Sequence, residues 1–188
     1  DAAHCHRSVL AELLATEYAD ARLVDSEASI DAENYRAALS AHYDAGPRYR
    51  FGNLRVEGLN RYSPELVERY NRVIRVGQPY RETQLNSLQG LLQATPYFAS
   101  VQTTLDRQAA EIQPDGSAIA PVLVSVRERE AHRVSFGAGA SSNTGARVEV
   151  NYSTPNLFNQ AWDLSSGLRF EQKRQTAYAD VFLPPDER

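Results

Sequence analysis

The sequence contains no methionine, one cysteine and one tryptophan among its 188 residues. Because Cys5 has no second cysteine with which to pair, no disulfide can form within the chain, and the redox compartment stays open. A start at Asp1, with no signal sequence and no methionine, predicts a fragment or a processed chain. The longest apolar run, around residues 120–126, has the length of a strand, so no segment reaches the ~20 apolar residues that a transmembrane helix needs.

Signatures of several function classes are also missing. A net charge of -4 with interspersed signs argues against a nucleic-acid surface. The donors of His4-Cys5-His6 point in different directions and no second cluster completes a tetrahedral metal site, so we interpret them as the start of a helix. His42 and His132 lack a serine or cysteine partner motif, and Glu128 and Glu130 are interpreted as solvated charges on one strand face. We therefore predict no enzyme, no cofactor and no metal.

The last third of the chain alternates between apolar and polar or small residues. Val134 and Phe136 alternate with Ser135 and Gly137, and the pattern returns in residues 148–152 and 162–170. Period-two alternation predicts strands with one apolar and one polar face. Strands of a transmembrane β-barrel have this pattern at roughly 10 residues per segment. A soluble antiparallel meander with one hydrated face is the alternative.

The first two thirds predict an α+β organisation. We expect a helix over residues 8–17 with Ser8 as N-cap, followed by a hairpin of residues 18–29 and 34–44 that turns at residues 31–33. Gly46-Pro47 then separates this part from a second unit.

The second unit begins with an expected strand over residues 49–57. A helix starts at Ser63-Pro64, and its apolar face continues through Val73 and Ile74. A second helix carries Leu85, Leu88, Leu91 and Leu92, and strands over residues 97–106 and 120–129 follow. Burial of both apolar helix faces predicts a three-stranded sheet with two helices on one face.

Three stretches together resemble the BamA/TamA superfamily of outer-membrane assembly factors, in its TamA-like branch. Residues 46–52 with 54–58 resemble the entry into the last POTRA (polypeptide-transport-associated) domain. Residues 77–80 through Tyr97-Phe98, with Val101, resemble its two-helix segment. Residues 134–170, especially 142–147 and Asn156-Leu157-Phe158, resemble the opening strands of the family's barrel.

The resemblance implies a division into three parts. Residues 1–46 are the C-terminal part of one POTRA domain, residues 47–132 are a complete POTRA domain, and residues 133–188 are the first strands of a truncated outer-membrane β-barrel. The first POTRA domain and the late lumen-entering loop of the family are missing. Because ~55 residues fit about four strands, we expect no closed barrel, and we expect these strands to form a small irregular sheet, pair with a copy, or be mobile.

The implied function is the insertion or secretion of β-barrel proteins, autotransporters among them, at the outer membrane of a Gram-negative bacterium. The POTRA part is periplasmic, and the implied partners are unfolded client proteins, an inner-membrane-anchored partner that spans the periplasm, and outer-membrane lipid. Client strands add to sheet edges by main-chain pairing. An outer-membrane pore of the two-partner-secretion type, which exports a protein through its lumen, is the alternative.

Two strands carry the implied sites. The POTRA edge lies in residues 97–106, and the side chains at this edge are those of Phe98, Val101, Thr103 and Leu105. For Phe98 and Val101 the alternative is that they seal the core beneath the helices. The seam of the barrel lies in its first strand, at Val134, Phe136, Gly137 and Gly139. Here the alternative for both glycines is an ordinary strand position.

Overall fold

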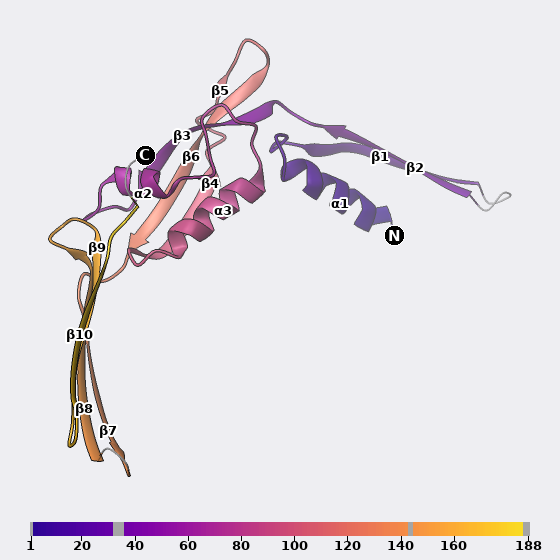
Figure 1. Cartoon of the computed structure of the whole chain (residues 1–188). Helices are drawn as coiled ribbons and strands as arrows, with labels where there is room; N and C mark the ends of the chain where they lie inside the picture. The colour runs from indigo at the N-terminus through magenta and orange to yellow at the C-terminus, as the bar shows by residue number, and fades with distance from the viewer. Residues whose placement is uncertain (1, 32–35, 143–144, 186–188) are drawn as a thin grey trace. The chain divides into compact units, whose positions relative to one another are not determined.

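A computed structural model describes residues 2–31, 36–142 and 145–185 of the chain, in an α+β fold with mostly antiparallel strands (Figure 1). The chain divides into two compact units, each described separately below. Unit 1 comprises residues 1–55, 72–89 and 103–124, and unit 2 comprises residues 56–71, 90–102 and 125–188. No helix in the described residues is long and apolar enough to cross a membrane.

Unit 1 begins with helix α1 (Ala2–Leu14) and a hairpin of β1 (Arg22–Asp31) and β2 (Arg36–Asp44). The expected hairpin is therefore present, although part of its expected turn lies outside the described residues. The expected helix start is wrong, because α1 already includes residues 2–7 and Ser8 lies inside it and not at its N-cap. The side chains of His4-Cys5-His6 lie outside the described residues.

Hydrogen bonds in unit 1 fix the segment that follows the first helix. The Tyr49 backbone N–H donates to the Glu17 carbonyl at 2.7 Å, and the Glu82 N–H donates to the Ala15 carbonyl at 2.9 Å. The Tyr49 hydroxyl donates to Asp20 at 2.5 Å, and Arg107 donates to the same carboxylate at 2.8 Å. Tyr49 itself is only 4% exposed. The segment that follows α1 is therefore packed against Tyr49 and is not a loose linker.

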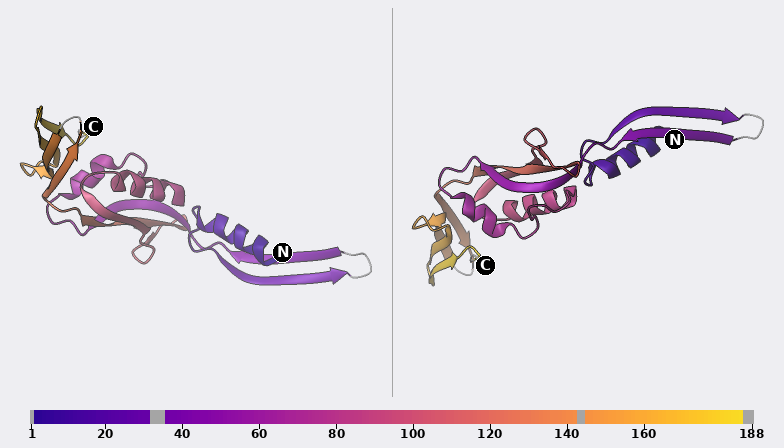
Figure 2. Two further views of the ribbon diagram at one scale, coloured as in Figure 1. Left: turned by 90° about the horizontal axis from the view of Figure 1, so that it is seen from below. Right: turned by 90° about the horizontal axis from the view of Figure 1, so that it is seen from above.

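A four-stranded sheet, one strand more than predicted, contains the path β3-β6-β4, with β3 at Arg48–Glu57, β6 at Ser117–Glu128 and β4 at Phe98–Leu105. The short strand β5 (Glu111–Ile112) pairs with β6 off this path. Along β6 every second side chain is buried, from Ala118 to Val126, which is the alternation of a strand with one face on a core. Figure 2 shows helices α2 (Pro64–Tyr70) and α3 (Glu82–Gln93) on one face of this sheet.

Helix α2 (Pro64–Tyr70) starts where the sequence predicts, with Ser63 as N-cap and Pro64 in its first turn. It ends earlier than expected, because the Asn71 N–H bonds the Glu68 carbonyl and Asn71 is extended. Val73 and Ile74 therefore lie beyond the helix, although Ile74 is buried.

Helix α3 (Glu82–Gln93) buries Leu85, Leu88 and Leu92 as expected, whereas Leu91 is 43% exposed. Aromatic rings complete the core of each unit. In unit 1, Phe51 packs edge-on against Tyr80 at 5.4 Å between ring centroids. In unit 2, Tyr97 packs against Tyr62 at 5.2 Å and against Tyr70 at 6.1 Å. Such edge-to-face pairs stabilise a core beyond the area that they bury.

The last strands form an antiparallel sheet in unit 2 with the order β10-β9-β8-β7. Their bounds are Arg133–Ser141 for β7, Gly145–Leu157 for β8, Trp162–Glu171 for β9 and Gln175–Phe182 for β10. Pairing is continuous except for a register shift between Thr154 and Leu157. The sheet is a continuously paired meander with this one irregularity. The other two expectations, pairing with a copy and mobility, stay predictions.

Candidate functional site

Strand β4 lies at one end of the β3-β6-β4 path, so one side of its main chain faces away from β6. The side chains of Phe98, Val101 and Thr103 are buried, with 0%, 7% and 7% exposed, and Leu105 is half-buried. These predicted site residues therefore face the interior. The exposed side chains of β4 are Ser100, Gln102 and Thr104. On the side that faces away from β6, β4 exposes main-chain groups.

The side-chain amide of Gln93, the last residue of α3, meets this outer main chain. Gln93 Oε1 accepts the Val101 backbone N–H at 2.9 Å, and Gln93 Nε2 donates to the Ala99 carbonyl at 3.2 Å. Both contacts lie within unit 2. One amide group thus satisfies a donor and an acceptor of β4 that are two residues apart.

Gln89, one turn earlier on α3, makes the acceptor half of such a contact within unit 1. Its Oε1 accepts the Thr103 backbone N–H at 3.0 Å. The Thr103 hydroxyl lies 3.2 Å from the Leu85 carbonyl oxygen and 3.2 Å from Gln89 Oε1. Sequence reasoning missed both glutamines, because polar residues four apart on a helix are ordinarily its solvent face.

A hollow of about 410 Å³ lies in unit 1 beside the end of β4. Both apolar and polar side chains line it, and the apolar ones come from α1, α3 and β4. The principal lining residues are Leu14, Leu85, Leu105, Asn86, Glu82 and Arg107.

Strand β7 is the end strand of the four-stranded sheet, where the predicted seam residues lie. Val134 and Phe136 are 53% and 79% exposed on one face. Gly137 and Gly139 lie on the other face, opposite Glu149 and Arg147. A Cβ at Gly137 would lie 3.7 Å from its nearest neighbour and one at Gly139 would lie 3.5 Å away, so neither glycine is required for space.

The register gives this sheet one apolar and one polar face. Phe136 pairs with Val150, Val150 pairs with Leu168, and Leu168 pairs with Ala177, which places all four in one row on the apolar face. Other exposed side chains of this face include Val134, Val148, Phe170 and Val181. The described residues thus include an apolar sheet face that no other element covers.

Polar side chains bond one another on the opposite face. Arg169 pairs with Glu149 at 2.9 Å, and Asn151 donates to Glu149 at 2.9 Å. The Tyr178 hydroxyl donates to Asn151 at 3.0 Å across the intervening strand, passing over Gly167. A Cβ at Gly167 would lie 2.4 Å from Asn151 and 2.5 Å from the Tyr178 ring. Gly167 therefore makes room for this cross-strand contact.

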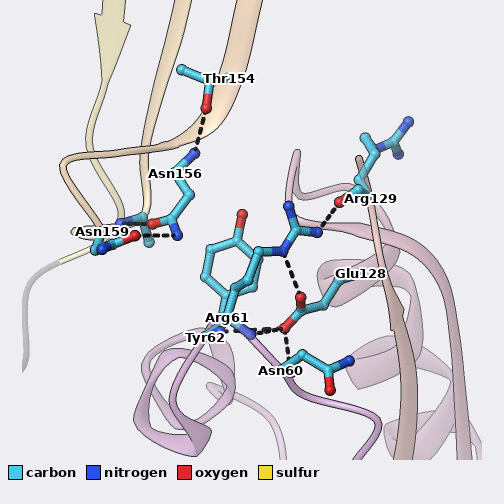
Figure 3. A network of polar contacts seen from close by, with 9 residues as sticks. Asn60, Arg61, Tyr62, Glu128, Arg129, Thr154, Asn156 and Asn159 are labelled. Atoms are coloured by element: carbon cyan, nitrogen blue, oxygen red, sulfur yellow. Dashed lines mark hydrogen bonds and ion pairs between the residues drawn. The ribbon is translucent and has the colours of Figure 1, made fainter. Parts of the chain in front are cut away.

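Glu128, the last residue of β6, is half-buried with a side chain only 5% exposed, and is not the solvated charge that the sequence suggested. Its Oε1 accepts the backbone N–H groups of Asn60 at 2.8 Å, Arg61 at 2.8 Å and Tyr62 at 3.2 Å (Figure 3). Arg61 also pairs with Oε2 at 2.8 Å and donates to the Arg129 carbonyl. Burial raises the pKa of Glu128, but the backbone donors and the Arg61 guanidinium together outweigh it and lower this pKa.

The turn between β8 and β9 is held by Asn156 and contacts Tyr97. Asn156 Oδ1 accepts the Ala161 N–H at 2.9 Å, and its Nδ2 donates to Asn159 at 3.3 Å (Figure 3). Phe158, Asn159 and Ala161 have φ angles of 57°, 58° and 56°, which are uncommon for residues with a side chain. The Tyr97 hydroxyl donates to the Ala161 carbonyl at 2.8 Å. The strained turn is therefore tied to the residue that precedes β4.

No family model matches the chain. The chain is similar to the crystal structure of BamA from Haemophilus ducreyi lacking POTRA domains 1-3, with 17% identity and a TM-score of 0.63. It is also similar to CdiB from Acinetobacter baumannii, with 13% identity and a TM-score of 0.50. The first match covers 82% of this chain and 28% of that one, and the second covers 93% and 32%.

The chain thus spans about a third of the length of these two proteins and shares the fold of the part that it matches. The predicted resemblance to the BamA/TamA superfamily is confirmed at the level of the fold. Its TamA-like branch stays a prediction.

Proposed function

We propose that this chain is part of an outer-membrane assembly factor that inserts or secretes β-barrel proteins by pairing with client strands. In this proposal residues 47–132 are a complete POTRA domain, and residues 1–46 are the C-terminal part of a preceding one. Residues 133–188 are the opening strands of a barrel. The shared fold with the BamA structure supports this division.

The two-faced sheet β7–β10 is the observation that carries the membrane part of the proposal. Phe136, Leu168 and Phe170 stand 79%, 49% and 51% exposed on its apolar face, while charged and amide side chains bond one another on the other. Lipid would contact the apolar side chains of one face, and water would contact the polar side chains of the other. A soluble meander would instead cover its apolar face with protein, and the described residues contain no such cover.

The edge of β4 supports the pairing mechanism. An edge strand presents main-chain donors and acceptors that recognise any extended segment, whatever its sequence. Because Phe98, Val101 and Thr103 are buried, a client strand on β4 would pair with main chain and leave the core intact. Because such pairing uses main-chain groups, it tolerates many client sequences.

Strand β7 would act as a second pairing edge, inside the membrane. Its outer side has no neighbour in the described sheet, and unpaired main-chain groups are costly in lipid. An entering client strand would satisfy them. The proposed location is the outer membrane of a Gram-negative bacterium with the POTRA part in the periplasm. The proposed partners are protein clients, autotransporters among them, and an inner-membrane-anchored protein that spans the periplasm.

Site-specific photo-crosslinking tests the proposal. The protein that carries this chain is expressed from its complete gene in a Gram-negative host, with a photoreactive residue at Thr104, which is exposed on β4. The matched control is Arg55, which is exposed on β3 at the opposite end of the same sheet. During synthesis of a β-barrel client, we expect crosslinks from Thr104 and few from Arg55.

Two other outcomes would change the account. Equal or absent crosslinks at both positions would contradict client pairing at β4. Crosslinks to a single exported protein from Thr176, on the polar face of β10, without any from Thr104, would favour the export pore.

A further inference from the structure

We propose that Gln89 and Gln93 form a removable cover over the pairing edge of β4, which an incoming client strand must displace. The inference rests on the proposed function, because it assumes that this edge receives a strand. It adds that three main-chain groups of the edge, the Ala99 carbonyl and the Val101 and Thr103 N–H groups, are occupied at rest. It also assigns the closure to two residues of α3.

The Gln93 amide imitates one residue of a neighbouring strand. In a parallel ladder, a residue donates its N–H to the carbonyl of residue i−1 and accepts the N–H of residue i+1 on the next strand. Gln93 does both around Ser100, since it donates to the Ala99 carbonyl and accepts the Val101 N–H. The atoms it occupies are those that a client strand would use.

Gln89 accepts the next outward N–H of β4, that of Thr103. A separation of four residues on a helix is about 6 Å along its axis, and two residues of a strand span about 6.6 Å. Gln93 and Gln89 are four apart on α3, and their partners Val101 and Thr103 are two apart on β4. The spacing of the two glutamines along α3 therefore matches the spacing of their partners along β4. One face of the helix can thus bond successive outward main-chain groups of the strand.

The hydrogen bonds of the two glutamines are weak enough for an incoming strand to displace them. Both glutamines are uncharged, and a neutral hydrogen bond contributes little net stability because water competes for the same groups. Gln93 is exposed and Gln89 is half-buried, so each amide can turn to solvent without opening the leucine core of α3. A cover of this kind also prevents two copies of the chain from pairing edge to edge.

Peptide binding to the whole 188-residue chain in detergent tests the cover. The probe is a blocked synthetic peptide with the sequence of β10, QTAYADVF, which is an amphipathic strand. The variants are Gln93→Ala and the double variant Gln89→Ala with Gln93→Ala. The control is Gln84→Ala on the same helix, whose side chain makes no hydrogen bond to β4 in the described part of the chain.

We expect the peptide to bind the single variant about fivefold more tightly than the wild type, and the double variant more tightly still. Gln84→Ala should bind like the wild type. A peptide with proline at the positions of Ala177 and Ala179 should not bind, because proline removes main-chain donors. Amide hydrogen exchange without peptide should accelerate at Val101 in the single variant and also at Thr103 in the double variant. Circular dichroism identifies any variant that does not fold.

The outcomes separate the inference from the function on which it rests. Equal peptide affinity for wild type and variants would overturn the cover and leave strand pairing intact. Binding to none of them would overturn both. Unchanged exchange at Val101 and Thr103 in the folded variants would also overturn the cover, whatever the peptide does.

Discussion

Arg61 holds the Glu128 carboxylate twice, through its guanidinium Nε at 2.8 Å and through its own backbone N–H at 2.8 Å. The contact joins the segment before α2 to the end of β6, and Glu128 is only 5% exposed at its side chain. Because the hydrogen bonds go to a charged group, their loss costs more than the loss of neutral ones.

Glu128→Gln should therefore lower the free energy of unfolding by about 2 kcal/mol. The lowered pKa of Glu128 makes the effect pH-dependent. Stability from this group is present above its unfolded pKa, about 4.3, and is lost as the pH falls through the lower folded pKa. Urea unfolding between pH 7 and pH 3 should show a smaller acid loss for Glu128→Gln than for the wild type. The exposed Glu130→Gln is the control, and equal acid loss in both variants would contradict the role of Glu128.

Gly58 should tolerate no side chain. Its φ is +88°, and a Cβ there would lie 2.0 Å from the Val126 carbonyl oxygen. Gly77 has a similar φ of +84° but no atom within 4 Å of the same position. Gly77→Ala should cost only the left-handed conformation, about 1 kcal/mol, whereas Gly58→Ala should cost several times more. Thermal unfolding of the two variants measures the difference, and equal costs would contradict the close approach to Val126.

The Tyr49 hydroxyl should resist ionisation. Burial, then its hydrogen bond to Asp20, raises the pKa of Tyr49 to about 12. The unfolded chain ionises near pH 10, so the stability from Tyr49 is complete below pH 10 and is lost as the pH rises towards 12. Absorbance titration of the wild type minus Tyr49→Phe should show a tyrosinate step near pH 12. Tyr18→Phe is the control, and a step near pH 10 for Tyr49 would contradict the packing of Tyr49 against the segment that follows α1.

The two faces of the β7–β10 sheet should respond oppositely to charge. Phe136→Arg places a cation on the apolar face, where lipid contact would make it cost about 2–4 kcal/mol. Ser135→Arg places the same charge on the polar face of the same strand. We expect the first variant to reduce recovery of the protein in the outer-membrane fraction and the second to leave it unchanged. Similar recovery of both would argue against lipid on the apolar face.

The strands and the start of α2 could be predicted from the sequence because local patterns determine them. Alternation from Val134 onward indicates strand, and Ser63-Pro64 indicates a helix start. The end of α2 could not be predicted, because Ile74 continues the helical spacing of Leu66 and Val67 while lying in a separate buried segment. Apolar spacing does not distinguish a longer helix from a second piece of chain on the same core.

The site could be predicted only as a strand. The sequence placed the edge in residues 97–106, and the sheet order puts β4 at an end. Its assignment as a client site stays a prediction. Glu128 was missed because its partners are main-chain atoms far along the sequence, such as Asn60. Such partners leave no local pattern. The glutamines were missed because polar residues four apart on a helix ordinarily face solvent.

Electrophoresis of the protein that carries this chain tests the central claim most directly. The protein is expressed from its complete gene in a Gram-negative host, the membranes are separated, and heated and unheated samples are compared. The account predicts a band in the outer-membrane fraction that changes migration on heating, as a closed barrel does when it unfolds. A soluble protein whose migration does not change would contradict the membrane assignment of β7–β10, and with it the proposed assembly function.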